Sequence, residues 1–418
     1  MRENISLKRF IPYFTLTMIV LVSTLILWLP FILRFSHWLG LSISESNFLY
    51  IYKHYDGPLY IIPAKSFYDP EIIKTLRVDI SLIPGYYAAH LPLYSLFIRI
   101  FSYVFGYLKS MIFTNVFFTV ILAGFFYYFI RFFQITKKPL LLATIFLFLP
   151  RFLVVRSVGA PESLFILLVL VSLFFFEKKN YLFAGVFGGL ATMTKSPGIL
   201  LFFAYLLAIG EQCLKQNNPV NIRNPIGNGL PAGRQGLPRS FDVTSGFARD
   251  DNNAKFAFNW RWFGLIFIPI GLLLVFILYY FQFGDFFAYF KSGDNIHLVF
   301  PYAIFNASKS WVGTAWLEDV LFVFFIYILT VITLRNTKHR SFFYFSLVYL
   351  IATTFVQHRD ISRYSLPLWP MACIAFESFF TSKKFKIAAM ILLPAIFLYA
   401  WNFFVQNVMP IGEWQPFL

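Results

Sequence analysis

The feature that most constrains the fold of this chain is a series of long apolar runs separated by short polar segments. A run of about 17–25 apolar residues is long enough to cross the hydrocarbon core of a bilayer as a helix. Charged residues make up 13% of the 418 residues and the mean hydropathy is +0.68, whereas soluble domains carry roughly 25% charged residues. The pattern predicts an all-α polytopic membrane protein and excludes a cytosolic globular protein.

The runs predict about eleven transmembrane helices. They lie near residues 11–33, 111–132, 139–155, 163–176, 181–195, 198–212, 259–281, 319–334, 341–357, 365–381 and 385–405. Pro150 and Pro197 interrupt short runs, so we expect broken helices there. The first run follows Arg2, Lys8 and Arg9, is too long for a signal-peptide core and lacks a small-residue cleavage site. It therefore indicates an uncleaved anchor with a cytoplasmic N-terminus.

The distribution of charge supports this topology. The basic residues of the predicted cytoplasmic loops are Lys137, Lys138, Lys178, Lys179, Arg335, Lys338, Arg340, Lys383, Lys384 and Lys386. Most acidic residues fall in the predicted external loops. Because cytoplasmic loops of membrane proteins are rich in Lys and Arg, the net charge of +16 does not indicate a nucleic-acid partner. We expect a multi-pass protein of the plasma (inner) membrane in contact with its lipids.

The chain divides into three parts. An N-terminal transmembrane module, residues 1–213, contains a large first external loop at 36–91, and a C-terminal transmembrane module covers 259–418. Between them, residues 214–258 are rich in Gly, Pro, Asn and Arg, which is typical of a flexible cytoplasmic insertion. Cys213 and Cys373 support neither a disulfide framework nor a Cys-based metal site, and the six histidines have no compact ligand spacing. No metal site is predicted, although a divalent cation could still bind carboxylates that meet in the fold.

The first external loop contains a candidate general base. Asp56 lies beside His54, Lys53 and several tyrosines, including Tyr60. A carboxylate there could accept a proton from a substrate hydroxyl that comes within about 3 Å. The alternative is an Asp-Gly-Pro turn that only shapes the loop, and spacing alone favours this turn.

Two further candidates lie where predicted external loops meet helices. Glu162 follows Pro161 at the start of a predicted helix, where an acidic residue complements the helix dipole. It could equally be a second carboxylate that faces the same cavity as Asp56. Lys195 lies between two short apolar runs, where it could hold an anion or extend to the membrane interface.

A third external segment contains Arg359, Asp360, Arg363 and Tyr364. External arginines are less expected than cytoplasmic ones, so this pair needs an explanation. A guanidinium is a planar donor suited to phosphate oxygens, and a lipid phosphate would be such a ligand. The alternative is pairing with acidic residues at the surface, which contributes little to stability.

Five fragments of the chain, in order, resemble motifs of the GPI-mannosyltransferase-like family, a branch of the GT-C superfamily of membrane glycosyltransferases that includes bacterial homologues. The fragments are Tyr55-Asp56-Gly57-x-x-Tyr60-x-x-x-Ala64-x-x-x-Tyr68, His90-Leu-Pro92-Leu-Tyr94, Pro161-Glu162-Ser163-Leu-Phe165, Thr194-Lys195-Ser-Pro197-Gly198 and Ser362-Arg363-Tyr364-x-Leu-Pro367. There are departures from the family pattern. Tyr55 stands where the family usually has Trp, and Lys195 where it has Arg.

The resemblance implies a mannosyltransferase-like enzyme that moves a sugar from a polyprenyl-phosphate-sugar donor to a lipid, glycan or protein acceptor. The reaction would take place on the external side of the membrane, with inversion at the sugar carbon. Asp56 would be the general base. The resemblance further implies that the substrate-binding residues are Tyr60, His90, Glu162, Lys195, Arg359, Arg363 and Tyr364. Arg363, with Arg359 or Lys195, would steady the phosphate, and Glu162 would position acceptor hydroxyls.

Two other functions, and a catalytically inactive scaffold, remain open from the sequence. A lipid-linked glycan ligase would share the fold and differ in its donor. A transporter or flippase of lipid-linked sugars would show internal repeats and charges within the spans. The chain has no convincing repeat, and its acidic residues collect in the predicted external loops. These features favour the transferase.

Overall fold

The computed structural model describes residues 2–43, 47–78, 82–217, 259–292, 298–305 and 314–418. Most of the predicted insertion at 214–258, from residue 218 on, lies outside the described residues. In chain order the α-helices are α1 (Arg2–Ile32), α2 (Leu49–Tyr52), α3 (Ile61–Ser66), α4 (Pro70–Thr75), α5 (Pro92–Phe105), α6 (Tyr107–Phe132), α7 (Pro139–Leu147), α8 (Pro150–Val155), α9 (Glu162–Glu177), α10 (Tyr181–Thr194), α11 (Leu200–Asn217), α12 (Phe267–Phe283), α13 (Ala288–Lys291), α14 (Thr314–Leu334), α15 (Arg340–Thr354), α16 (Ile361–Tyr364), α17 (Trp369–Ala375), α18 (Glu377–Phe380) and α19 (Lys383–Gln406).

Short 3-10 helices connect several of these helices, and one hairpin is the sheet of the described chain. The 3-10 helices are η1 (Gly57–Tyr60), η2 (Pro84–Ala89), η3 (Ser196–Ile199), η4 (Trp260–Ile266), η5 (Ala303–Phe305), η6 (Leu366–Leu368) and η7 (Gln415–Phe417). Strands β1 (His37–Trp38) and β2 (Leu41–Ser42) pair antiparallel, with Trp38 opposite Leu41. Leu39 and Gly40 between them both have positive φ, as a two-residue hairpin turn requires.

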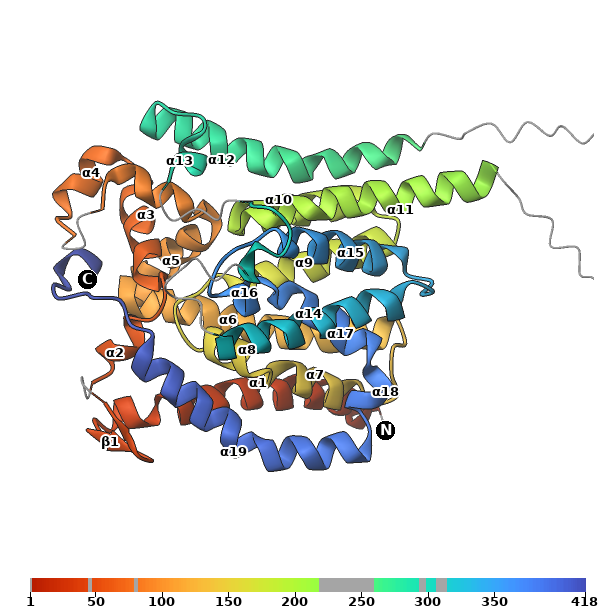
Figure 1. Cartoon of the computed structure of the whole chain (residues 1–418), viewed down its shortest axis with the longest axis horizontal. Coiled ribbons are helices and arrows are strands. Elements are labelled where there is room, and N and C mark those ends of the chain that lie inside the picture. Colours follow the sequence, from red (N-terminus) through yellow and green to blue (C-terminus); the bar gives the residue numbers. More distant parts are fainter. Residues whose placement is uncertain (1, 44–46, 79–81, 218–258, 293–297, 306–313) are drawn as a thin grey trace, which may run out of the picture.

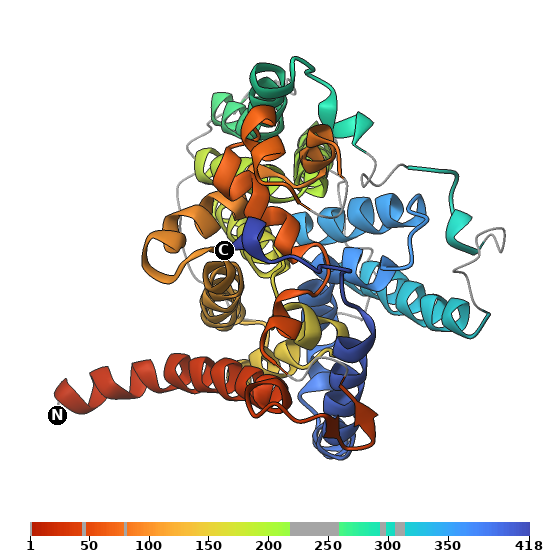
Figure 2. The same ribbon diagram turned by 90° about the vertical axis from the view of Figure 1, so that its left-hand side faces the viewer.

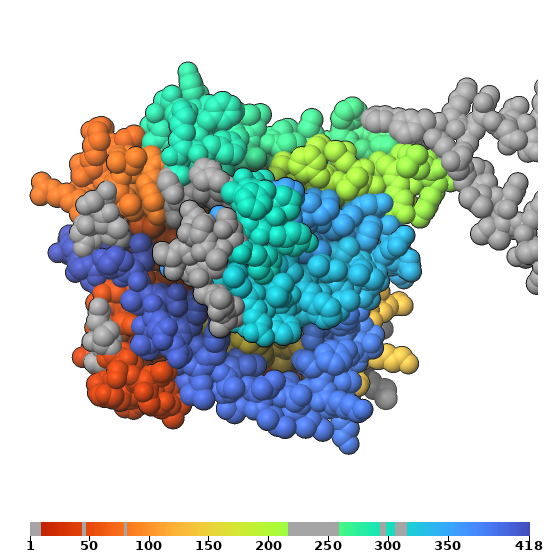
Figure 3. All heavy atoms as spheres, viewed as in Figure 1, coloured from red at the N-terminus to blue at the C-terminus, as the bar shows by residue number. Residues whose placement is uncertain are grey.

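The long helices lie side by side, and their ends define the two ends of the molecule. One end carries the short helices α2, α3, α4 and α13 and the C-terminus, and the other carries α18 and the N-terminus (Figure 1). Figure 2 views the molecule from the first of these ends, with the C-terminal segment near the centre. In the space-filling view, α11 and α12 form the upper edge of one face and α19 forms its lower edge (Figure 3).

Every predicted span is helical in the structure. Among the described residues, six helical segments are long and apolar enough to cross a membrane by themselves: Phe10–Ile32, Tyr107–Phe132, Ser196–Lys215, Trp260–Phe283, Trp316–Leu334 and Lys383–Gln406. The remaining five of the eleven predicted spans are shorter. The helix is interrupted before Pro150, where α7 ends and α8 begins, and Pro197 lies in η3 between α10 and α11. Both expected interruptions are therefore present. The protein is an all-α polytopic membrane protein.

The basic loops meet at the end of the bundle that carries α18. Lys138 donates a hydrogen bond to the carbonyl of Thr381, with Nζ and O 2.9 Å apart. His339 Nδ1 lies 2.9 Å from Glu177 Oε2, and Arg340 pairs with Glu211 at 2.5 Å. These contacts join the ends of α7, α9, α11, α15 and α18, so the basic segments share one end of the fold as the topology predicts.

Glycines allow α10 and α12 to pack closely. A Cβ at Gly189 would lie 2.4 Å from the carbonyl oxygen of Phe267, and a Cβ at Gly271 would lie 2.4 Å from the carbonyl oxygen of Gly189. Small residues permit such approach of helix backbones in membrane proteins. This packing fixes the end of α10, from which Lys195 extends.

Candidate functional site

A cavity of about 330 Å³ lies at the end of the bundle opposite the basic loops. Its wall combines a charged cluster with aliphatic and aromatic side chains from η3, α12, α13 and α15. The lining residues include Asp56, Tyr60, His90, Lys195, Ile199, Leu200, Leu272, Phe276, Tyr289, Leu298, Tyr349, Val356, Arg363 and Tyr364. The cavity therefore suits a ligand with one polar, charged part and one apolar part.

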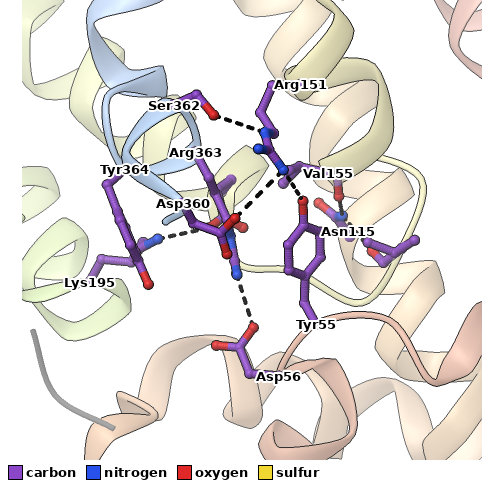
Figure 4. Close-up of polar contacts among 12 residues, drawn as sticks. Tyr55, Asp56, Asn115, Arg151, Val155, Lys195, Asp360, Ser362, Arg363 and Tyr364 are labelled. Carbon is purple, nitrogen blue, oxygen red and sulfur yellow. Dashed lines mark hydrogen bonds and ion pairs between the residues drawn. The ribbon is translucent and has the colours of Figure 1, made fainter. Parts of the chain in front are cut away.

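Four charged side chains form a continuous chain of ion pairs at this cavity. Arg363 Nη2 lies 3.1 Å from Asp56 Oδ1, and Arg363 Nε lies 2.7 Å from Glu162 Oε1. Lys195 Nζ lies 2.7 Å from the same Glu162 oxygen. Figure 4 shows Lys195 beside Tyr364, and Asp56 below the end of the Arg363 side chain. The structure thus brings together residues that are up to 307 positions apart in the sequence.

Asp56 is positioned by a tight turn that packs against a second turn. Tyr55 has a positive φ of 51°, and η1 begins at Gly57 with Pro58 in its first turn. A Cβ at Gly57 would lie 2.6 Å from the carbonyl oxygen of Gly159. The turn expected from Asp-Gly-Pro is present, and it also brings Asp56 into the cavity. The two interpretations of this motif are therefore compatible.

Glu162 is held at the start of α9 by the turn that precedes it. Asn115 on α6 donates hydrogen bonds to the carbonyls of Val155 and Val158, at 2.8 and 2.6 Å. Ser163, the next residue, shares a 2.7 Å hydrogen bond with Thr119 of α6. The Glu162 side chain is 2% exposed and is not one of the described residues that line the cavity. Glu162 thus lies behind Lys195 and Arg363. It does not face the cavity, so the interpretation of Glu162 as a second carboxylate in the cavity wall is wrong.

The remaining predicted binding residues, apart from Arg359, line the cavity. Lys195 has an extended backbone between α10 and η3, and its Nζ lies 5.2 Å from the ring centroid of Tyr364. His90 Nε2 is 3.8 Å from Asp56 Oδ2, and the His90 ring meets the Tyr60 ring edge to face at 4.8 Å. His90 therefore faces the Asp56 oxygen that does not pair with Arg363.

The charges determine the protonation of the two carboxylates. Burial raises the pKa of Asp56, but the positive charge of Arg363, helped by His90 and Lys195, outweighs this effect and lowers the pKa to about 2. Burial acts on Glu162 in the same way, and Arg363 and Lys195 lower its pKa in turn. Both groups are carboxylates at neutral pH. The cluster holds two positive and two negative charges before any ligand enters.

Arg359 does not belong to this cluster. Its side chain is exposed, and it is not among the described residues that line the cavity. Arg151 lies beside the cluster instead, although sequence reasoning did not select it because it falls inside the predicted span 139–155. The sequence signal for Arg151 is a charged residue within an apolar run, directly after Pro150.

No metal centre is visible in the part of the chain that the structure describes. Groups of three or more His, Cys, Asp or Glu side chains that could hold an ion do not occur there. The carboxylates of Asp56 and Glu162 are paired with basic side chains.

Residues 89–220 match the family model described as dolichyl-phosphate-mannose-protein mannosyltransferase. The matched segment contains His90, Arg151, Glu162 and Lys195. Together with the polytopic helical fold, the match supports a membrane glycosyltransferase of the GT-C type, in agreement with the superfamily expected from the motifs. The narrower resemblance to GPI-mannosyltransferase-like proteins stays a prediction. A comparison with curated proteins found no match.

Proposed function

We propose that the protein transfers a sugar, mannose or a close relative, from a polyprenyl-phosphate-sugar donor to a hydroxyl of a lipid, glycan or protein acceptor. The single observation that carries the proposal is the cavity in which Asp56, Lys195 and Arg363 stand beside an apolar wall. An amphiphilic donor has a phosphate for the charged part and a hydrocarbon chain for the apolar part. The volume of about 330 Å³ lies near the lower end of the range for ligand sites, about 300–1,000 Å³, which suits one sugar better than a preassembled glycan.

In this reaction Asp56 is the general base. The acceptor hydroxyl gives its proton to the Asp56 carboxylate as its oxygen attacks the anomeric carbon. The bond from that carbon to the phosphate oxygen breaks, the electron pair goes to the phosphate, and the configuration inverts. Arg363 and Lys195 hold the phosphate, whose negative charge grows in the transition state, and such preorganised charge is a large part of enzymatic rate enhancement.

Arg363 links donor binding to the strength of the base. A carboxylate with a pKa of about 2 is a weak proton acceptor, and a base works best when its pKa lies near the working pH. A donor phosphate competes with Asp56 for Arg363. As the phosphate takes up the guanidinium, Asp56 loses its strongest positive neighbour and its pKa rises. The base therefore becomes effective only when the donor is in place.

Glu162 acts through the two basic residues. Because its Oε1 accepts hydrogen bonds from both Lys195 and Arg363, it keeps them side by side after the phosphate arrives. This role replaces the positioning of acceptor hydroxyls that the motif resemblance implies, since Glu162 lies behind the cavity wall.

The orientation that we propose for the protein in the membrane follows from the positions of the basic loops and the cavity at opposite ends of the bundle. The basic loops gather at the α18 end, and the cavity lies at the other end. Basic loops are favoured on the cytoplasmic side, so the N-terminus is cytoplasmic and the cavity opens on the external side of the plasma membrane.

The test uses purified protein in liposomes with a panel of radiolabelled polyprenyl-phosphate sugars and crude acceptor lipids. We expect transfer by the wild type and a loss of about 10²–10⁴-fold in Asp56→Asn, the usual contribution of general acid–base catalysis. Asp69→Asn is the matched control, because Asp69 lies in the same external loop and caps α4 with its side chain. An Asp56→Asn enzyme with most of the wild-type rate would refute the base. Wild-type protein that flips labelled donor without transfer would favour the transporter.

A further inference from the structure

Arg151 touches both segments that carry the charged cluster. It follows Pro150 at the start of α8, and its side chain is 15% exposed. Nη1 donates a hydrogen bond to the phenol oxygen of Tyr55 at 3.0 Å, and Nε donates one to Ser362 Oγ at 3.0 Å. Nη1 also lies 3.6 Å from Asp360 Oδ1. Figure 4 shows the guanidinium between the Tyr55 ring and the α16 segment.

These two segments hold Arg363 from two sides. The Tyr55 ring stacks on the Arg363 guanidinium, with the ring centroid 4.3 Å from Cζ. Asp360 and Ser362 belong to the turn of α16 that carries Arg363, and the Asp360 carbonyl accepts the Arg363 backbone N–H at 2.8 Å. Fixing the phenol oxygen and the turn at once therefore sets the plane of the Arg363 side chain. Arg151 itself is not one of the described residues that line the cavity.

We propose that Arg151 is a positioning residue, which fixes Tyr55 and the α16 turn in register so that Arg363 bridges Asp56 and Glu162. Only the expected kinetic effect of Arg151 rests on the proposed function; its structural role does not. An arginine is required because its guanidinium carries donors in a rigid plane, and here two of them address different acceptors. The single ammonium of a lysine is a point charge that cannot reproduce that fork. Phe403 packs against the guanidinium, with Cζ 4.6 Å from the ring centroid, and limits its movement.

The first test measures Arg151→Lys without a substrate. Carbodiimide reacts with protonated carboxyl groups, so labelling of Asp56 at pH 5, read by mass spectrometry, reports whether Arg363 still pairs with it. In the wild type the pKa of Asp56 is about 2, and that of a free aspartate is about 4. We expect at least about tenfold more labelling in Arg151→Lys. Glu71, which is 80% exposed, serves as the internal standard.

The matched control is Arg131→Lys. Arg131 Nη1 also donates to a tyrosine, with 3.3 Å to Tyr127 Oη, and its guanidinium also lies over that ring. This pair lies within α6 near the basic end of the bundle, so its loss should leave Asp56 labelling unchanged. Unchanged labelling in Arg151→Lys as well would overturn the proposal, whatever the enzymatic activity.

The second test is kinetic. We expect Arg151→Lys to lower kcat by about 10–100-fold, because a displacement near 1 Å costs about that much, with a smaller change in the KM for the donor. The charge on the phosphate grows as the bond breaks, so a misaligned Arg363 weakens the transition state more than the ground state. Tyr55→Phe keeps the ring and removes the oxygen that accepts from Arg151. In the Arg151→Lys background we expect it to cause no further loss.

The two tests distinguish the two proposals. Changed labelling together with an inactive wild type would contradict the proposed function and leave the role of Arg151 intact. An active wild type and an Arg151→Lys variant with unaltered kcat would contradict the role of Arg151. Additive losses in the double variant would also contradict it, since residues that act through one contact are not additive.

Discussion

The contact between Gly57 and Gly159 gives the sharpest prediction, because it joins the turn that carries Asp56 to the turn that precedes Glu162. A Cβ added at Gly57 would lie 2.6 Å from the Gly159 carbonyl oxygen and 3.2 Å from its carbonyl carbon and Cα. Ordinary contacts between such atoms are about 3.5 Å, so one backbone segment has to move by somewhat less than about 1 Å. The neighbour is backbone, which cannot rotate away.

We therefore expect Gly57→Ala to cost about 1–3 kcal/mol of stability, the usual range for overpacking a buried position. The same displacement moves Asp56 relative to Arg363, and about 1 Å at a reacting group lowers the rate by about 100-fold. Donor-dependent transfer in liposomes and thermal unfolding in detergent measure the two effects separately.

Gly85→Ala is the matched control. Gly85 belongs to the same external loop, and a Cβ there meets no atom within 4 Å. A compatible Gly→Ala change stabilises by about 0.4–1 kcal/mol through the unfolded chain, so this variant should be fully active and slightly more stable. A Gly57→Ala variant with the wild-type kcat would refute the argument that the contact between the two turns aligns Asp56 with Arg363.

Three further predictions concern the titratable groups Glu162, Asp56 and His54. Glu162→Gln removes the carboxylate shared by Lys195 and Arg363 and should destabilise by about 3–5 kcal/mol; a loss below about 1 kcal/mol in denaturant unfolding would contradict the buried network. The pKa of Asp56, about 2, lies below its unfolded value of about 4. The contribution of the Asp56 carboxylate to protein stability is therefore complete above about pH 4 and disappears as the pH falls from about 4 to 2. The Asp56→Asn variant should lack this loss of stability. Burial lowers the pKa of His54 to about 4, below its unfolded value of about 6.5. The contribution of the neutral His54 ring to protein stability is therefore complete above about pH 6.5 and disappears as the pH falls from about 6.5 to 4. A wild-type melting temperature that stays constant over that window would count against a buried neutral imidazole.

His54 also illustrates how the C-terminal segment supports the first external loop. Its ring nitrogens lie 3.0 Å from the carbonyl oxygen of Tyr50 and 2.7 Å from that of Phe404. The backbone of Met409 donates a hydrogen bond to the Lys53 carbonyl at 2.8 Å. The loop that carries Asp56 is therefore anchored by residues about 350 positions away in the chain.

The sequence alone determined the class of fold, and it predicts the side of the membrane on which the site lies. Apolar runs, basic loops and interrupting prolines are local properties, and they follow from the cost of placing polar groups in hydrocarbon. Local motifs likewise singled out Asp56, Lys195 and Arg363. Each motif had a purely structural explanation, because a turn or a helix start has the same residues whether or not it faces a cavity.

Only the tertiary structure decided which of these residues lie together. It placed Arg363 between Asp56 and Glu162, moved Glu162 behind the cavity wall and left Arg359 exposed. It also connected Arg151 to Tyr55, 96 positions away. Ion pairing and stacking depend on distances of a few ångströms between separate helices. Those distances arise from helix packing, which the local pattern of apolar and polar residues does not encode.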